Sequence, residues 1–355
     1  MKGHNATNLI PALMALVILS ACVPVTPTTQ PTTLTTQTAT TIPTIQATDT
    51  RQPIHIKLGY IPYSSYLPFY IAQEEGYFTE QGLDVEMVKF SKQTEAIPVL
   101  VDGQIDVYAG QLDTMTLNAI AQGALVRFVA DKGYDNSAGC AYTAWVARQD
   151  LYTSGVLNDL HNLAGMKVAY PLGQSPEYAL DLLLKPAGLS SADVQIVDVS
   201  APNRVAALEN GAVDIAFLSE PYISQVISSG KGSIWHSWES YMPDFQLGVL
   251  LYGDAILKDP DAGQRFMVAY LKAVRQYMQG KTDRNVELMA AFLDTSPDVA
   301  RQSCWQSIRE DGSVNVQSIL DFQQWAVNKG YQLKALETSD FWDPSFVDYA
   351  NTVLK

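Results

Sequence analysis

The amino-acid sequence predicts an α/β protein with two lobes, and three observations support this fold class. Runs of strand type and helix type alternate from residue 54 onward, and the alternation starts again as a second set after Leu151. A further strand-like run, QLGVLLYGD, follows the second set and precedes a largely helical region from Pro260 to Lys355. Alternating strands and helices favour mainly parallel sheets that helices cover. The late strand implies that the chain returns to the first lobe.

The first set begins at Ile54, where IHIKLGY alternates like a strand and LPFYIAQEEGYF has apolar residues at helical spacing. The strands expected after it are LDVEMVKF, IDVYAG, ALVRFVADKGY and AYTAWVAR, and the helices expected between them are QTEAIPVLVDG and DTMTLNAIAQG. In the later helical region, AGQRFMVAYLKAVRQYMQG predicts a helix with one apolar face. That face comprises Phe266, Ala269, Tyr270, Ala273, Val274 and Tyr277.

The second set predicts a separate lobe with its own sheet. Its expected strands are LAGMKVAYPLG, VQIVDVS and VDIAFLSEP, and its expected helices are SPEYALDLLLKPAG and NRVAALENG. Residues 54–147 and 246–355 are assigned to lobe 1, and residues 148–245 to lobe 2. The two crossings between lobes are placed near Thr143–Arg148 and Gln246–Tyr252. Two crossings form a hinge, and the cleft between the lobes is where a ligand is expected.

The first 50 residues read as an export signal and a tether. Lys2 precedes the uncharged apolar run Leu9–Leu19, which is too short to span a hydrocarbon layer of about 30 Å. The run ends in LSAC, which resembles a bacterial lipoprotein signal, so residues 1–22 are predicted to be the signal peptide and Cys22 the lipidated residue. An ordinary secretory signal is the alternative. Residues 23–50, rich in Thr and Pro, predict a disordered tether.

The composition argues against several classes of function. The 355 residues suffice for a large buried core, but their formal net charge of −14 repels phosphate backbones, so no nucleic acid is expected as a partner. The three cysteines and four histidines form no CxxC or HExxH motif. No metal and no other cofactor is therefore expected.

Four blocks of sequence, in order, carry a resemblance to a known family. They are LPFYIAQEEGYFTEQGLDVEMV, IPVLVDGQIDVYAG, LAGMKVAYPLGQSPEYALDLLLKPAGLSSADVQIVDV and AALENGAVDIAFLSEPY. The chain resembles the substrate-binding lipoproteins of ABC importers, in the branch that serves nitrate, sulfonates, taurine and thiamine pyrimidine precursors. The resemblance implies a type II periplasmic binding protein fold. It also implies a membrane permease and an ATPase as partners.

Candidate ligand-binding residues are those in loops at the carboxyl ends of strands, where helix N-termini point free N–H groups into the crevice. An aromatic cluster before the return crossing, in GSIWHSWESYMP, adds one more residue that could close over a ligand. The candidates are Tyr60, Tyr63, Ser64, Tyr66, Gln111, Asp113, Tyr134, Asp135, Gln174, Ser175, Glu177, Tyr178, Glu220, Tyr222 and Trp235.

The composition of these loops favours a heteroaromatic solute. The loops hold many tyrosines and several carboxylates, one lysine and no arginine. Tyrosine rings can sandwich a planar heterocycle, and Asp, Glu and Gln can pair with ring N–H and amino groups. The preferred solutes are a thiamine pyrimidine precursor or riboflavin. A sulfonate, taurine or nitrate is the alternative within the same family.

Two other functions are compared with the binding role: an enzyme and a sensor. The fold family includes pyrimidine synthases with a cysteine-rich iron motif and a lysine for pyridoxal phosphate, but GCAY at residues 139–142 holds a single cysteine. A binding protein is therefore predicted, not an enzyme. A sensor lipoprotein that passes its liganded form to a receptor stays open as an alternative. Export permits a disulfide between Cys140 and Cys304, and the sequence leaves their pairing open.

The predicted mechanism is hinge closure by a monomer on the outer side of the cell membrane, held there by its lipid anchor. A solute that contacts both lobes favours the closed form, which the permease recognises.

Overall fold

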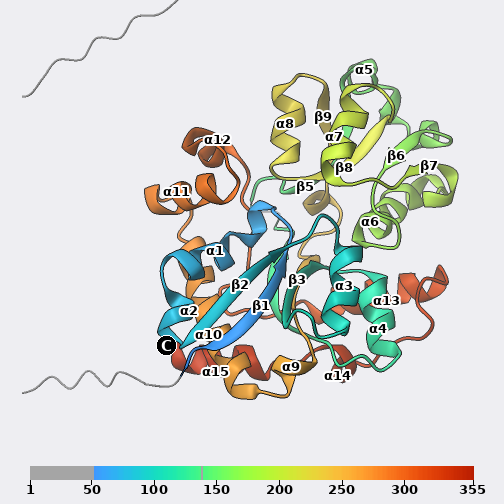
Figure 1. The fold of residues 1–355 in the computed structure, drawn as a ribbon. Coiled ribbons are helices and arrows are strands. Elements are labelled where there is room, and N and C mark those ends of the chain that lie inside the picture. Colours follow the sequence, from blue (N-terminus) through green and yellow to red (C-terminus); the bar gives the residue numbers. More distant parts are fainter. Residues whose placement is uncertain (1–51, 137–138) are drawn as a thin grey trace, which may run out of the picture. The chain divides into compact units, whose positions relative to one another are not determined.

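The protein is represented by a computed structural model, which describes residues 52–136 and 139–355. The predicted signal peptide, the tether and Cys22 lie outside these residues. The described part forms two five-stranded sheets, each flanked by helices (Figure 1).

The sheet of lobe 1 has the strand order β2-β1-β3-β10-β4. Its strands are β1 (Ile54–Tyr60), β2 (Leu83–Lys89), β3 (Val107–Gln111), β4 (Arg127–Tyr134) and β10 (Gln246–Tyr252). The first three strands pair in parallel, whereas β10 runs antiparallel to both β3 and β4. The prediction that QLGVLLYGD returns to the first lobe is confirmed by this pairing.

The sheet of lobe 2 has the strand order β7-β6-β8-β5-β9. Its strands are β5 (Thr143–Arg148), β6 (Lys167–Ala169), β7 (Gln195–Val197), β8 (Ile215–Ser219) and β9 (Gly232–Ser237). Strands β6, β7 and β8 are parallel, and β5 pairs antiparallel with β8 and β9.

The position of β5 differs from the sequence-based division into lobes. Residues 143–147 were expected in lobe 1, with the first crossing near Thr143–Arg148, but this segment pairs in the second sheet. The run AYTAWVAR is buried on both faces, so its pattern identifies a strand without identifying the sheet that contains it. The chain instead crosses between the sheets after β4 and after β9. We call the described residues of these two connections, 135–136 with 139–142 and 238–245, the crossing segments.

Helices cover both sheets. In lobe 1, before the first crossing, they are η1 (Ser64–Tyr66), α1 (Leu67–Glu74), α2 (Tyr77–Glu80), α3 (Gln93–Val101) and α4 (Thr114–Ala121). In lobe 2 they are α5 (Gln149–Ser154), η2 (Val156–Asn158), η3 (Leu160–Leu163), α6 (Ser175–Leu184), η4 (Lys185–Ala187), η5 (Ser191–Asp193), α7 (Ala201–Glu209) and α8 (Tyr222–Ser228). The short helix η6 (Trp238–Ser240) opens the second crossing segment.

The chain after β10 is helical, as predicted. Its helices are α9 (Asp254–Leu257), α10 (Pro260–Tyr277), α11 (Asp283–Phe292), α12 (Pro297–Gln302), α13 (Val316–Asn328), α14 (Thr338–Phe341) and α15 (Ser345–Val353). The predicted apolar face of α10 is confirmed, because all six of its residues are buried. Phe69 of α1 stacks on Tyr270 of that face with 4.7 Å between ring centroids. Among the described residues, no helix combines the length and the apolar character that crossing a bilayer requires.

The apolar core is continuous between the two lobes. One cluster joins Leu117 and Phe128 of lobe 1 to Trp145 and Leu180 of lobe 2, and Phe245 of the second crossing segment belongs to it. Two further clusters fill the remaining sheet faces, one in each lobe. The lobes therefore share packing near the crossing segments in addition to the covalent chain.

A disulfide ties the first crossing segment to the helical region. Cys140 and Cys304 are bonded, with 5.7 Å between their Cα atoms and 164 residues between them in the chain. The sequence left this pairing open. The bond closes a long loop that includes the whole of lobe 2.

Replacing both cysteines, as Cys140→Ser with Cys304→Ser, should lower the free energy of unfolding by about 2–5 kcal/mol, because the bond restricts the unfolded chain. Urea unfolding followed by circular dichroism measures this change. Wild-type protein in reductant should unfold at the same urea midpoint as the double variant. Equal urea midpoints for oxidised wild type and variant would show that the bond contributes no stability.

Candidate functional site

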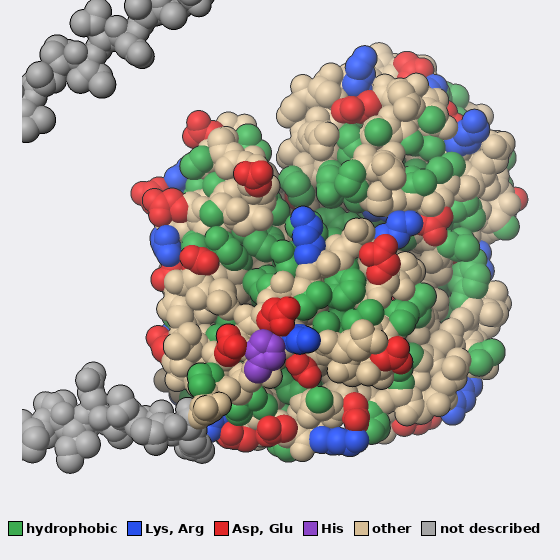
Figure 2. Space-filling view, viewed as in Figure 1, with side chains coloured by type: hydrophobic (Ala, Val, Ile, Leu, Met, Phe, Trp, Pro, Cys, Tyr) green, Lys and Arg blue, Asp and Glu red, His purple; other side chains and the backbone are tan. Residues whose placement is uncertain are grey.

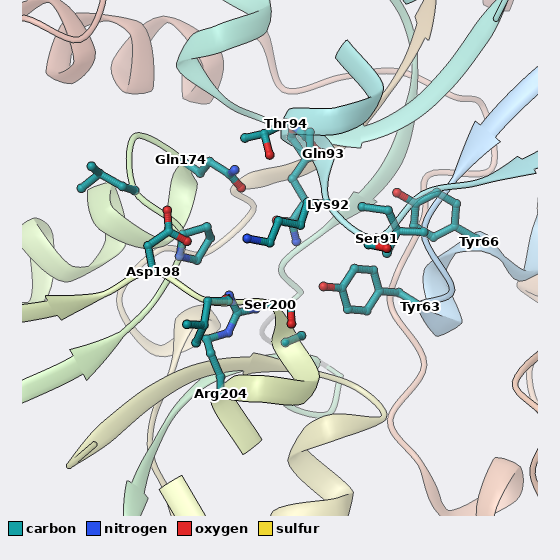
Figure 3. A pocket seen from close by; sticks show the side chains of 16 residues that line it. Tyr63, Tyr66, Ser91, Lys92, Gln93, Thr94, Gln174, Asp198, Ser200 and Arg204 are labelled. Carbon is teal, nitrogen blue, oxygen red and sulfur yellow. The ribbon is translucent and has the colours of Figure 1, made fainter. Parts of the chain in front are cut away.

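A cavity of about 90 Å³ lies between the two lobes (Figure 3). Both lobes contribute to its wall. The lining residues are Ile61, Tyr63, Tyr66, Ser91, Lys92, Gln93, Thr94, Gln111, Pro171, Leu172, Gln174, Asp198, Val199, Ser200, Ala201 and Arg204.

The wall is built at the carboxyl ends of parallel strands, as expected for α/β sheets. In lobe 1, the lining residues follow β1, β2 and β3. In lobe 2, they follow β6 and β7. Because each of these strands ends at the cleft, the loops that continue them meet across it.

Three helices begin at this wall. They are α3, α6 and α7, whose N-cap residues Lys92, Gln174 and Ser200 all line the cavity. None of the three N-cap side chains makes a capping hydrogen bond. First-turn N–H groups and the positive end of the helix dipole favour an anion at such a position.

Arg204 supplies a buried positive charge at the wall. Its side chain is 4% exposed, and in Figure 3 it extends from α7 toward the cavity. One terminal nitrogen, Nη1, donates to the carbonyl oxygen of Val199 at 3.1 Å, whereas Nε has no hydrogen-bond partner. Among residues 52–136 and 139–355, no carboxylate forms an ion pair with it.

The groups around Arg204 compensate only partly for the burial of its positive charge. Burial lowers the pKa of its guanidinium below the usual value, and the hydrogen bond with Tyr63 and the negative charge of Asp198 act in the opposite direction. The guanidinium also lies 5.6 Å from the ring centre of Phe217. A buried cation with an unused donor is costly unless something pairs with it. An anionic group of a ligand is one such partner.

Tyr63 reaches from lobe 1 to lobe 2. Its ring packs edge-on against Tyr222 of lobe 2 at 6.0 Å and lies 6.4 Å from Tyr66 at 28° between planes. Figure 3 shows its hydroxyl directed into the cavity. Burial raises the pKa of Tyr63, so the hydroxyl keeps its proton and can donate. Lys92, an exposed N-cap residue, adds a second cation at the wall.

Four of the residues predicted from the sequence line the cavity: Tyr63, Tyr66, Gln111 and Gln174. Five more predicted residues lie close behind it or touch residues of the wall. Ser64 and Ser175 are buried with no partner for their hydroxyl groups. Asp113 accepts from Gln93 and caps α4, Glu177 accepts from the N–H of Gly173 at 2.9 Å, and Tyr222 contacts Tyr63.

The other six predicted residues have partners outside the cavity wall. Tyr60 packs on Phe292, Tyr134 lies under Arg309, and Tyr178 contacts Phe245. Asp135 belongs to the first crossing segment, Glu220 accepts from Ser224, and Trp235 packs on His236. A ligand role for these six stays a prediction.

The sequence analysis missed two of the loops that form the wall. One is SKQT, residues 91–94, after β2, and the other is DVSA, residues 198–201, which follows β7 and leads into α7. Both follow strands that the sequence analysis identified, so the strand-end rule applied to every strand would have included them. Arg204 lies one helical turn into α7, beyond the loop itself, which is why a search of loop composition found no arginine.

The crossing segments are bonded to each other at Asp135. Its N–H donates to the carbonyl of Phe245 at 3.1 Å, and its carbonyl accepts from the N–H of Asp244 at 2.9 Å. Its carboxyl group accepts from the Thr143 hydroxyl at 2.8 Å, and the other carboxyl oxygen is buried without a partner. Burial raises the pKa of Asp135 to about 8; the bond from Thr143 opposes this rise and Glu239 adds to it.

Comparisons with known proteins agree with this architecture. The ligand-binding component of an ABC-type import system from Staphylococcus aureus superimposes with a TM-score of 0.71 at 19% identity, covering 84% of this chain and 99% of that one. The periplasmic nitrate-binding protein of Synechocystis gives 0.68 at 16% identity, covering 86% and 90%. The fold is therefore that of the two-lobed periplasmic binding proteins.

Sequence comparison places the chain within a family. A family model described as NMT1/THI5 like matches residues 64–281, more than half of the chain, and the protein belongs to that family. A Brucella abortus protein, named a binding protein without a stated ligand, is 25% identical over 245 residues, which cover 68% of this chain and 72% of that protein. A 4-amino-5-hydroxymethyl-2-methylpyrimidine phosphate synthase from Saccharomyces cerevisiae is 29% identical over 140 residues, covering 39% of this chain and 38% of the synthase.

Asp135→Asn should reduce the dependence of stability on pH. An unfolded aspartate titrates near pH 4, whereas the folded pKa is about 8. The contribution of the proton to stability is therefore complete below pH ~4 and is lost as the pH rises to about 8. Between pH 5 and 8.5 the free energy of unfolding should fall by roughly 2–4 kcal/mol less in the variant than in the wild type.

Urea unfolding at both pH values measures this difference. The exposed Asp321→Asn provides the matched control and should keep the wild-type profile. A steeper fall of stability with pH in Asp135→Asn than in wild type would contradict the protonated, buried state of Asp135.

Proposed function

We propose that the protein is the extracytoplasmic substrate-binding component of an ABC importer and that it captures a small solute with an anionic group. The two-lobed fold and the family support the binding role. The solute would be delivered to a membrane permease that an ATPase drives. The chain would act as a monomer, held at the membrane through a lipid on Cys22.

The environment of Arg204 is the observation that supports an anionic solute. It combines burial, an unpaired Nε and a position at the wall of the interlobe cavity. Three helix N-termini and Lys92 surround the same space, so several donors converge there. A carboxylate, sulfonate or phosphate group matches this set of donors.

One observation still supports the heteroaromatic solute that the sequence favours. Tyr63 and Tyr66 present neighbouring rings at the cavity wall. A thiamine pyrimidine precursor or riboflavin is therefore the second candidate. Of the tyrosines on which that preference rested, Tyr60, Tyr134 and Tyr178 pack elsewhere, which leaves fewer rings for a sandwich.

A binding protein is favoured over an enzyme. The similarity to the yeast synthase covers 39% of this chain, and Cys140, the single cysteine of GCAY, is bonded to Cys304. A thiol in a disulfide does not act as an iron ligand or a nucleophile. A sensor lipoprotein would use the same cleft, and a receptor in place of the permease would distinguish it.

The proposed mechanism follows from the placement of the donors. Arg204 and the N-terminus of α7 belong to lobe 2, whereas Tyr63 and the N-terminus of α3 belong to lobe 1. A solute held by both sets interacts fully only when the lobes are together. Its differential affinity for that arrangement shifts the population toward the closed form.

Arg204→Met should weaken binding of the anionic solute by about 10- to 100-fold, because a charge-assisted hydrogen bond contributes ~1.5–3 kcal/mol. The test is a thermal-shift screen with taurine, an alkanesulfonate, nitrate, a thiamine pyrimidine precursor and riboflavin, followed by calorimetry of the compounds that raise the melting temperature. Met keeps the apolar stem of the side chain but is shorter than Arg and loses the guanidinium contact with Phe217, so circular dichroism has to verify that the variant folds.

Arg127→Met is the matched control, since Arg127 is half-buried on β4 outside the cavity and should bind as wild type does. Binding of a neutral heterocycle alone, with equal affinity in Arg204→Met, would support the second candidate and refute the anionic class. If no compound in the screen binds, the proposed solute classes are wrong.

A further inference from the structure

The two lobes touch at a side-chain network that joins α6 of lobe 2 to α13 and the turn after it. Asp181 of α6 accepts from the indole N–H of Trp325 at 2.6 Å and pairs with Lys329 at 2.8 Å. Lys329 also donates to the Ser191 hydroxyl at 2.8 Å, and the Tyr331 hydroxyl donates to Glu177 at 2.8 Å. All three donors come from α13 and the turn after it.

The donors of this network are fixed to lobe 1. Asn118 of α4 donates to the carbonyl of Tyr331 at 2.6 Å and accepts from the N–H of Leu333 at 3.2 Å. The Ser318 hydroxyl of α13 accepts from the N–H of Gln246 at the start of β10. Movement of α6 relative to lobe 1 would therefore break the bonds to Asp181 and Glu177.

A second set of contacts reaches the segment just before α6. The N–H of Thr114 donates to the carbonyl of Gly173 at 3.2 Å, and the N–H of Ser175 donates to the carbonyl of Leu112 at 3.3 Å. These backbone bonds accompany a bridge between Asp113 and Gln174. Both the start and the middle of α6 are therefore bonded to lobe 1.

Apolar contacts also join α6 to the second crossing segment. Tyr178 lies 5.9 Å from Phe245, 5.8 Å from Phe322 and 5.6 Å from Trp325, measured between ring centroids. The crossing segment, α13 and α6 thus pack around one ring. Breaking this contact would expose aromatic surface, which is costly.

The opposite side of the cleft has fewer contacts between the lobes: Tyr63 packs edge-on against Tyr222 at the start of α8, and the N–H of Cys304 donates to Glu220 at 3.4 Å. A cavity of about 360 Å³ separates α8 of lobe 2 from the region of α11 and α12, and residues of both sides line it. Figure 1 shows α8 facing α11 and α12 across this space, and Figure 2 shows the same place as a notch in the surface. Movement of the lobes here would break the contacts of Tyr222 and Glu220 at the start of α8, whereas the rest of α8 faces the cavity.

We propose that the contact between α6 and α13, centred on Asp181, is a third and non-covalent element of the hinge. The lobes then swing about this contact, so that α8 moves relative to α11 and α12 while α6 keeps its place on lobe 1. Asp181 is a positioning residue in this arrangement, because it holds the helix whose N-terminus forms part of the ligand cavity. The inference goes beyond the proposed function, and it is tested without any ligand.

Spin-label distance measurements on the full-length chain test the proposal, with Cys22→Ser so that only introduced cysteines react. One label pair, Lys185→Cys with Asn328→Cys, spans the C-cap of α6 and the last residue of α13. The other, Ile227→Cys with Val299→Cys, spans α8 and α12 at residues that are 46% and 47% exposed. Without ligand, the first pair should give one narrow distance peak and the second a broad distribution.

Asp181→Asn, and independently Lys329→Met, should abolish the narrow peak of the first pair. Asp321→Asn on α13 is the matched control. Its carboxylate bonds only Gln317 of the same helix among the described hydrogen bonds and acts on Tyr178 of α6 through its charge alone, so the narrow peak should persist. Circular dichroism on each variant verifies folding. A broad distribution for the wild-type α6–α13 pair, or a narrow peak that survives in both folded variants, would overturn the proposal.

Discussion

The architecture depends on the insertion of one antiparallel strand. Strand β10 lies between β3 and β4, so the chain has to leave lobe 1 after β4, build lobe 2, and come back to complete the first sheet. This requirement produces the two crossing segments, which bond to each other at Asp135. It also places the carboxyl ends of the parallel strands of both sheets at one cleft, where donors from each lobe can meet a common ligand.

The positive charge at the cleft is largely buried. Water does not reach Arg204 freely, and the N-termini of α3, α6 and α7 add partial positive charge around it. The protein has a formal net charge of −14, so the long-range field would oppose the approach of the anionic solute proposed above, whereas Arg204 and the helix N-termini would favour its binding. Under the proposed function, selection of the solute would therefore depend on short contacts made after entry, and less on electrostatic steering.

Much of the fold could be predicted from the sequence, because the alternation of strands and helices is local. The return strand and the buried face of α10 are examples. The placement of β5 could not be predicted, since a strand buried on both faces has no pattern that identifies its sheet. Arg204 was missed because it lies inside a helix, and the pairing of Cys140 with Cys304 joins residues that only the folded chain brings together.

If the contact between α6 and α13 is part of the hinge, as proposed, the two sides of the cleft move by different amounts. One side holds α6 in register with lobe 1, while the other has room for movement between α8 and α12. A solute bound near Arg204 would then be enclosed by motion of one side of the cleft.

Solution X-ray scattering of the full-length chain with taurine, an alkanesulfonate and nitrate tests this account most directly. The account predicts that at least one of these anions lowers the radius of gyration of the wild type and leaves Arg204→Met unchanged. An equal decrease in Arg204→Met, or a decrease caused only by neutral heterocycles, would contradict it.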